Sequence, residues 1–209
     1  MHVIRNGALA LAILAALAGT ARAATVLRLT FEELTARSDA VVRGRVVSST
    51  PKLDSQKGRI TTFTEVEVTE SVKGAPAKKV TVRQPGGEVG GIGQSVAGAA
   101  RFTPGEEVVL FLQRAPDEAS VFQVLSMSAG KVRLEKKRSE LRAVRDLDGI
   151  DFLDRPAQAQ PRSPGGVTPG GVKVVSIEDL GDASRFLARL RAAARPAPAP
   201  APSKKEAKP

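Results

Sequence analysis

The sequence contains no cysteine, tyrosine or tryptophan, and its single histidine is His2. Without cysteine the chain can form no disulfide, and we expect no lipid-modified N-terminus. Once the N-terminal leader is removed, no histidine remains to ligate zinc, copper or haem, or to activate a nucleophilic serine. Catalysis would therefore have to use carboxylates, lysine, hydroxyls or an oxygen-ligated metal.

The first 23 residues have the pattern of a cleavable export signal. Arg5 supplies the positive charge, Ala8–Ala18 is an apolar run too short for a permanent membrane span, and Ala21-Arg22-Ala23 presents small residues to signal peptidase. We predict cleavage after Ala23 and a periplasmic or extracellular mature protein that begins at Ala24. The alternative, a buried N-terminal helix, is disfavoured because this stretch has no polar face.

The chain is basic, with a formal net charge of +10 that falls to +8 when the leader removes two arginines and no acidic residue. This charge favours anionic partners such as envelope polysaccharide, lipid headgroups or nucleic acid. Nucleic acid is the least favoured of these, because the chain is exported and lacks tyrosine and tryptophan for base stacking.

A two-residue period predicts strands through the first half of the chain. Apolar and charged residues alternate over Ala40–Ser49 and again over Ile60–Val72. If these strands pair in antiparallel fashion, the arginines at 43 and 45 can face the glutamates at 65 and 67. The unbroken apolar run Val108–Leu112 predicts a central strand covered on both faces. Further strands are predicted over Lys78–Gln84, Phe122–Met127 and Lys131–Leu134.

Two helices flank this β region. Thr30 and Glu33 have the spacing of a capping box, which predicts a short helix ending near Arg37. Near the C-terminus, Ser176 or Asp182 can cap a second helix. Its apolar face would dock on the barrel through Phe186, Leu187 and Leu190.

The predicted organisation has six parts in chain order. They are a signal peptide (1–23), a β-barrel domain (24–135), a peripheral hairpin (136–154), a Pro/Gly-rich linker (155–171), a short strand plus helix (172–194) and a disordered Pro/Ala/Lys tail (195–209). The predicted fold class is mainly β: a small OB-like five-stranded barrel with extra strands, a short N-terminal helix and a C-terminal helix.

Three segments carry a resemblance to a known module. Ser38–Val47, Glu65–Gly74 and Gly105–Phe111 are similar in order and spacing to the netrin-type module, the OB-like fold of tissue inhibitors of metalloproteinases. They also resemble secreted bacterial β-domain proteins with a comparable Gly-Gly loop and Gly-Glu strand. The resemblance covers about Phe31–Leu134 and implies a barrel. Those inhibitors chelate the protease zinc through an N-terminal cysteine, so their mechanism does not carry over to this cysteine-free chain.

The segment Pro85–Gly98 contains six glycines, which predicts a mobile hairpin or an open loop. It lacks the Gly-Lys-Ser/Thr ending of a phosphate-binding loop. We interpret it as a flexible recognition loop in which Gly86 and Gly87 shape the backbone and Glu88 and Gln94 supply polar contacts. The alternative is a plain hairpin without a ligand.

Four aspartates near the end of the β region raise the possibility of a calcium site, because hard cations bind clustered carboxylates. The spacing of Asp146, Asp148, Asp151 and Asp154, and the position of Gly149, depart from the EF-hand pattern, which favours a solvated turn. We therefore predict no metal site and no cofactor.

Two groupings are the candidates for catalysis. Glu106 and Glu107 are adjacent in a strand and would point to opposite faces, so they cannot act as a carboxylate pair without a bulge. Ser126 and Ser128 lie close in sequence to Lys131 and could form a serine–lysine dyad, a composition that is common by chance. We predict no catalytic residue.

These patterns favour an exported, non-enzymatic binding or scaffolding module of the cell envelope, without an integral membrane segment after cleavage. Its partner would be an unknown protein or an anionic envelope polymer. The second interpretation is a secreted inhibitor or accessory factor of an extracellular enzyme, and the third is a carboxylate-dependent hydrolase.

We expect deletion of Glu88–Gln94 to leave folding intact, because a glycine-rich loop contributes little apolar burial. Thermal unfolding of the deletion variant measures this directly. A large fall in the melting temperature would contradict a recognition role, since the segment would then be part of the folded framework.

Overall fold

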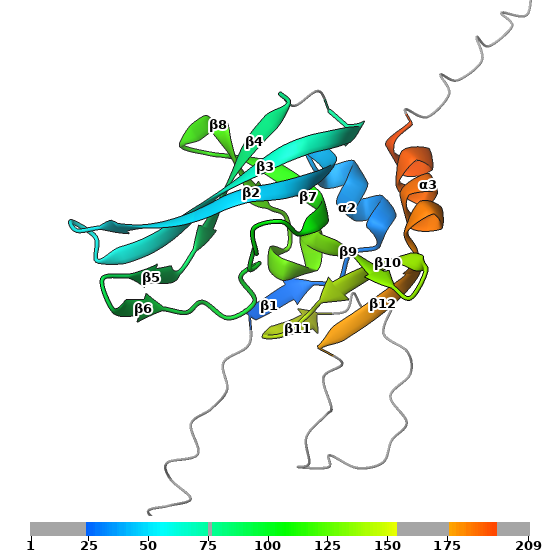
Figure 1. Cartoon of the computed structure of the whole chain (residues 1–209). Coiled ribbons are helices and arrows are strands. Elements are labelled where there is room, and N and C mark those ends of the chain that lie inside the picture. The colour runs from blue at the N-terminus through cyan, green and yellow to red at the C-terminus, as the bar shows by residue number, and fades with distance from the viewer. Residues whose placement is uncertain (1–23, 75–76, 154–175, 196–209) are drawn as a thin grey trace, which may run out of the picture.

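The computed structural model describes residues 24–74, 77–153 and 176–195, which form a mainly β fold with two α-helices (Figure 1). The predicted leader, the predicted linker, residues 172–175, the tail beyond 195 and position 154 all lie outside the described residues. Within the described part, no helix is long and apolar enough to cross a bilayer.

Five strands form a partial barrel-like ring within a mainly β fold, as the sequence predicts. Strand β2 pairs with β3 and β7, β3 pairs with β4, and β8 pairs with both β7 and β4. The parallel β4–β8 contact closes the ring through only two residue pairs, so this seam is narrow. The strands are β2 (Ala40–Asp54), β3 (Arg59–Lys73), β4 (Lys79–Pro85), β7 (Glu107–Ala115) and β8 (Glu118–Val124).

The sheet continues beyond the barrel from β7. Strands β9 (Lys131–Lys137), β10 (Glu140–Asp146) and β12 (Ile177–Asp182) follow β7 in that order, and β1 (Ala24–Leu27) pairs in parallel with β11 (Ile150–Leu153). This corrects the peripheral hairpin expected over 136–154, because β10 and β11 pair with other strands and not with each other. The physical reason is that buried Leu147 and Ile150 tie this segment to the body of the protein.

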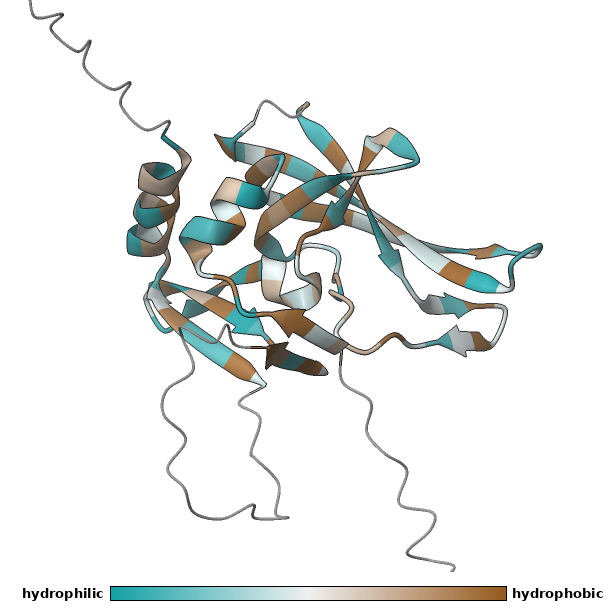
Figure 2. Ribbon diagram, turned by 180° about the vertical axis from the view of Figure 1, so that it is seen from behind, coloured by the Kyte–Doolittle hydropathy of each residue, from teal (hydrophilic) through white to brown (hydrophobic). Residues whose placement is uncertain are grey.

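Both faces of β7 are buried, as predicted for a central strand. Val109 and Phe111 face the two helices, whereas Val108, Leu110 and Leu112 face the barrel interior. All five side chains are fully buried, and each such burial stabilises the fold by about 1.5–3 kcal/mol. Figure 2 shows apolar and polar residues alternating along the long strands. This alternation is expected where one face of a strand packs on a core and the other meets solvent.

The helices cover one face of the sheet. Helix α2 (Phe31–Arg37) begins with the predicted capping box: Thr30 Oγ1 accepts from the Glu33 amide at 3.1 Å, and Glu33 Oε2 accepts from the Thr30 amide at 2.9 Å. Helix α3 (Ala183–Ala194) is capped by Asp182 and buries the predicted apolar face. The rings of Phe31 and Phe186 meet edge-on at 5.0 Å, which joins the two helices.

Strands β2 and β3 pair in antiparallel fashion as predicted, but their register shifts at three places. Arg45 lies opposite Glu67, whereas Arg43 lies opposite Glu70. The guanidinium of Arg43 instead binds the Glu107 carboxylate of β7, with 2.7 Å between Nε and Oε1. Strict alternation in the sequence could not reveal these irregularities.

The pair between Arg191 of α3 and Glu70 of β3 makes helix docking sensitive to acid. Arg191 donates to both Glu70 oxygens at 2.7 and 2.9 Å, and this hydrogen bonding lowers the pKa of Glu70. The charged form is favoured in the folded state. The contribution is therefore complete above the ordinary glutamate pKa and is lost as the pH falls through the lowered value.

We expect Glu70→Gln to reduce the free energy of unfolding at neutral pH by up to about 1 kcal/mol, because the pair is partly exposed. The difference from the unaltered protein should vanish when the pH falls below the lowered pKa of Glu70, as measured by urea unfolding at neutral and at acid pH. Glu67→Gln is the matched control, since Glu67 is exposed on the same strand and forms no ion pair among the described residues. An equal loss at both pH values would contradict the ion-pair explanation.

Candidate functional site

Two hairpins extend from the same side of the barrel (Figure 1). The long hairpin is formed by β2 and β3, and the glycine hairpin by β5 (Gly87–Val89) and β6 (Ile92–Gln94). Between them lies a groove of about 610 Å³, which we call the hairpin groove. Its walls include Ser49 and Thr62 from the long hairpin and residues from the segment 84–102.

Gly86 and Gly87, both predicted to shape the loop, fix the base of the glycine hairpin. Both have positive φ, 93° and 137°, which favours glycine. The Gly86 amide donates to the Ile60 carbonyl at 2.8 Å, and the Gly86 carbonyl accepts from Thr62 Oγ1 at 2.6 Å. A Cβ at Gly87 would lie 2.6 Å from Thr62 Oγ1, so the two hairpins approach each other too closely for a side chain there.

Gln94 and Glu88, both predicted to contact a ligand, have different environments. The side-chain oxygen of Gln94 accepts a hydrogen bond from the Ile60 backbone amide at 2.7 Å, so the Gln94 side chain joins the glycine hairpin to β3. Glu88 is exposed in the middle of β5 and has no hydrogen bond or ion pair within the described part of the chain. Of the two polar residues predicted to contact a ligand, Glu88 is therefore the one whose side chain is not already used within the described part of the chain.

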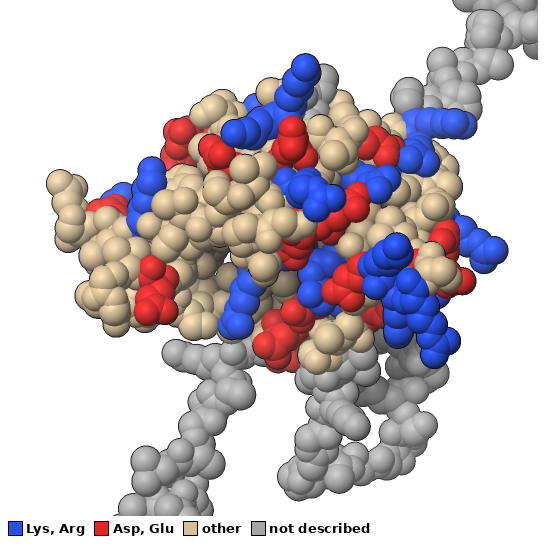
Figure 3. Space-filling view, in the orientation of Figure 1, with Lys and Arg blue, Asp and Glu red and all other residues tan. Residues whose placement is uncertain are grey.

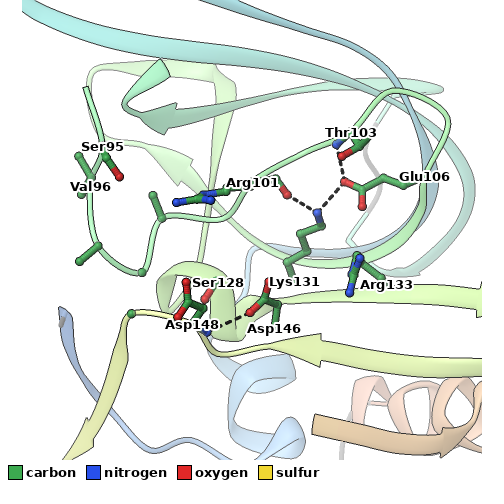
Figure 4. Close-up of a pocket in the computed structure, with 14 residues that line it drawn as sticks. Ser95, Val96, Arg101, Thr103, Glu106, Ser128, Lys131, Arg133, Asp146 and Asp148 are labelled. Carbon is green, nitrogen blue, oxygen red and sulfur yellow. Dashed lines mark hydrogen bonds and ion pairs between the residues drawn. The ribbon is translucent and has the colours of Figure 1, made fainter. Parts of the chain in front are cut away.

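A second hollow of about 340 Å³ adjoins the hairpin groove (Figure 4). We call it the lysine pocket, because Lys131 at the start of β9 lies in its wall. The segment Ser95–Arg101 lines both hollows and forms the partition between them. The position of this partition therefore sets the shape of both.

Lys131 holds the loop that continues from the partition. Its ammonium donates to the Arg101 carbonyl and to Glu106 Oε1, the latter at 2.6 Å. It also lies 4.6 Å from the centre of the Phe102 ring. The same Glu106 oxygen accepts from the Thr103 amide at 2.9 Å. The loop is therefore wrapped around a single cation.

Burial governs the electrostatics of this pair. The Lys131 side chain is 8% exposed and that of Glu106 is 15% exposed. Desolvation lowers the pKa of Lys131, and the hydrogen bond to Glu106 opposes that shift. The direct contact between Lys131 and Glu106 thus compensates two charges that are both poorly solvated.

The groups considered for catalysis are not brought together. Figure 4 shows the Lys131 ammonium directed toward Glu106 and the Arg101 backbone, away from Ser128. Ser128 Oγ is buried and has no hydrogen-bond partner among the described residues, and Ser126 has a left-handed backbone before a short 3-10 turn. The geometry therefore does not build a serine–lysine dyad.

Glu106, the residue before β7, and Glu107, the first residue of β7, contact different partners. Glu106 binds Lys131 on one side, and Glu107 binds Arg43 on the other. Both carboxylates are occupied by cations and cannot act as a pair on one substrate atom.

The aspartates form a turn rather than a cluster. Asp146 Oδ1 accepts from the Asp148 amide at 3.0 Å in the connection between β10 and β11, and Asp151 lies in β11 opposite Thr25. Residues 24–74, 77–153 and 176–195 contain no group of three acidic, histidine or cysteine side chains placed to hold a metal ion.

Several residues of the site are not apparent from the sequence. Arg101 and Arg133 line the lysine pocket, and Ser49 and Thr62 line the hairpin groove. Each is an ordinary polar residue of a strand or loop, without a motif. Their convergence depends on strand register and on how the long hairpin folds over the glycine hairpin. A scan against protein-family models and a search of curated proteins found no match for the chain.

We expect Glu106→Gln to lower the free energy of unfolding by about 3 kcal/mol, because it leaves the buried Lys131 ammonium without a counter-charge. Urea unfolding measures the loss. In the double variant Glu106→Gln with Lys131→Met, the buried charge is gone, and we expect at least half of the lost stability to return. A double variant no more stable than the single variant would show that the loop does not depend on this pair.

Proposed function

We propose that the protein is an exported, non-enzymatic binding module of the cell envelope that holds a partner protein in the hairpin groove. The runner-up from the sequence, an inhibitor or accessory factor of an extracellular enzyme, uses the same surface with an enzyme as the partner. The observation that carries the proposal is a groove between two projecting hairpins whose lining carries only two charged residues, Glu88 and Arg101, on an otherwise highly charged molecule.

The charge distribution supports a protein partner. Figure 3 shows few charged side chains over the two hairpins and many over the part that holds β9, β10 and α3. The segment Pro85–Ala100 contains a single charged residue, Glu88. Leu53 and Ile92 near the hairpin tips are 40% and 59% exposed. Charge depletion with exposed apolar side chains is typical of the central part of a protein interface.

The ionic contacts support binding rather than turnover. A carboxylate-dependent hydrolase needs an acid whose proton is available to a substrate. Glu106 and Glu107 are each bound to a cation, and the lysine of the pocket is bound to Glu106. These interactions fix the walls of the hollows, which suits a preformed binding surface.

An anionic envelope polymer remains the second candidate, because one exposed turn is strongly basic. Lys136 and Lys137 at the end of β9 and Arg138 in the turn to β10 are consecutive and exposed. This turn lies outside the hairpin groove. Binding there would depend strongly on salt, whereas binding in a groove with few charges would depend on it less.

The absence of native cysteine allows each surface to be blocked separately. Ser95→Cys places a thiol at an exposed position of the hairpin groove, and Lys136→Cys places one on the basic turn. Each variant is labelled with a bulky maleimide, and its retention on isolated envelope material is measured by sedimentation at low and high salt. We expect the label at position 95 to reduce retention at least tenfold and the label at position 136 to leave it unchanged.

Protease treatment of the envelope material separates the partners. A protein partner predicts that retention is lost after proteolysis and falls less at high salt than binding to the basic turn would. The binding surface would be the basic turn and not the groove if retention survives proteolysis, disappears at high salt and is blocked only by the label at position 136. Retention unaffected by either label would contradict both candidates.

A further inference from the structure

Gly93, in the middle of β6, is a glycine that the folded chain does not require. Among the described glycines, all others either have positive φ or, like Gly44 and Gly130, would bring a Cβ against neighbouring backbone. Gly93 has neither feature, and a Cβ there would meet nothing within 4 Å. Glycine weakens a strand and commonly marks a place where another backbone approaches closely.

The edge of β6 is available for such an approach. Gly90 and Gly91 have φ values of 60° and 79°, the two-residue turn of a tight hairpin. The residues flanking that turn exchange hydrogen bonds, so the next pair, Glu88 and Gly93, does not. The N–H and C=O of Gly93 therefore point away from β5, and among the described strands β6 pairs with β5 alone.

Glu88 gives this edge a charge preference. It lies directly opposite Gly93 in the hairpin and has no partner in the described part of the chain. A residue that faced Gly93 from a third strand would project to the same side as Glu88. The missing side chain at position 93 leaves an open path of about two strand spacings, about 10 Å, between that residue and the Glu88 carboxylate.

We propose that the β6 edge binds an extended segment of a partner protein by strand addition, with a lysine or arginine opposite Gly93 that reaches Glu88 across the glycine. The inference rests on the proposed function and specifies its partner. A second copy of the chain fits less well. Two β6 edges paired about a two-fold axis at Gly93 would bring two Glu88 carboxylates to the same face, with no cation between them.

The test uses the isotope-labelled protein and four synthetic seven-residue peptides with blocked ends. They alternate threonine and valine, and their central residue is lysine, arginine, glutamate or alanine. Amide resonances are followed in NMR titrations up to about 1 mM, which detects weak binding. We expect the lysine and arginine peptides to shift the Gly93 and Ser95 amides, and the glutamate peptide to bind roughly tenfold more weakly or not at all.

Variants test the role of Gly93 and the role of the Glu88 charge separately. Gly93→Val should leave the urea unfolding midpoint unchanged or higher, since a β-branched residue suits a strand, and should weaken the lysine peptide at least tenfold. Glu88→Lys should reverse the preference between the lysine and glutamate peptides. Glu118→Lys, the same charge change at an exposed position of β8 outside the groove, should not.

Two results would overturn the inference: no peptide shifting the Gly93 amide, or binding by Gly93→Val equal to that of the unaltered protein. A third such result would be self-association of the protein without peptide, detected by sedimentation, as the source of the Gly93 shifts. If Gly93→Val keeps full retention on envelope material while the label at position 95 abolishes it, the binding module stands and strand addition at β6 is wrong.

Discussion

The whole molecule depends on β7 being removed from water on both faces. Its alternating side chains belong to two separate apolar clusters, one inside the barrel and one beneath the helices. The strand therefore joins the barrel to the β9–β10–β12 extension, and neither part could expose its side of β7 without a large loss of apolar burial. This shared strand also leads directly from the Glu106 loop, so the site is built on the best-buried element of the fold.

The Lys131–Glu106 ion pair is largely buried, like the apolar residues of the core. A buried ion pair contributes little net stability by itself, but losing one partner is costly. Here the cation is also bound by the Arg101 carbonyl and lies against Phe102. One side chain thus fixes the loop from Arg101 to Glu106, and the partition between the two hollows is positioned as a result.

Periodicity and capping patterns were sufficient for much of the fold. The capping box of α2, the apolar face of α3 and the two-faced burial of Val108–Leu112 follow from local patterns with a single physical solution. The partner strands of β10 and β11 and the ion pair between Arg43 and Glu107 did not, because bulges and long-range pairing leave no trace in alternation.

The candidate site was predictable only in part for the same reason. Glycine spacing identified the segment that forms the glycine hairpin, but not that Gln94 is used to fasten it to Ile60. Nor does the sequence around Lys131 distinguish a buried cation from a surface one. That distinction arises from the loop that folds over it.

The long hairpin has a mechanical consequence. Its strands run fifteen residues each from the tip, beside the glycine hairpin, back to the helical end of the molecule, where Arg191 binds Glu70 (Figure 1). Interstrand hydrogen bonds lie perpendicular to the strands. Tension between a bound partner and α3 would run along these strands and load many ladder bonds in shear at once, a geometry that resists force far better than peeling them apart one at a time.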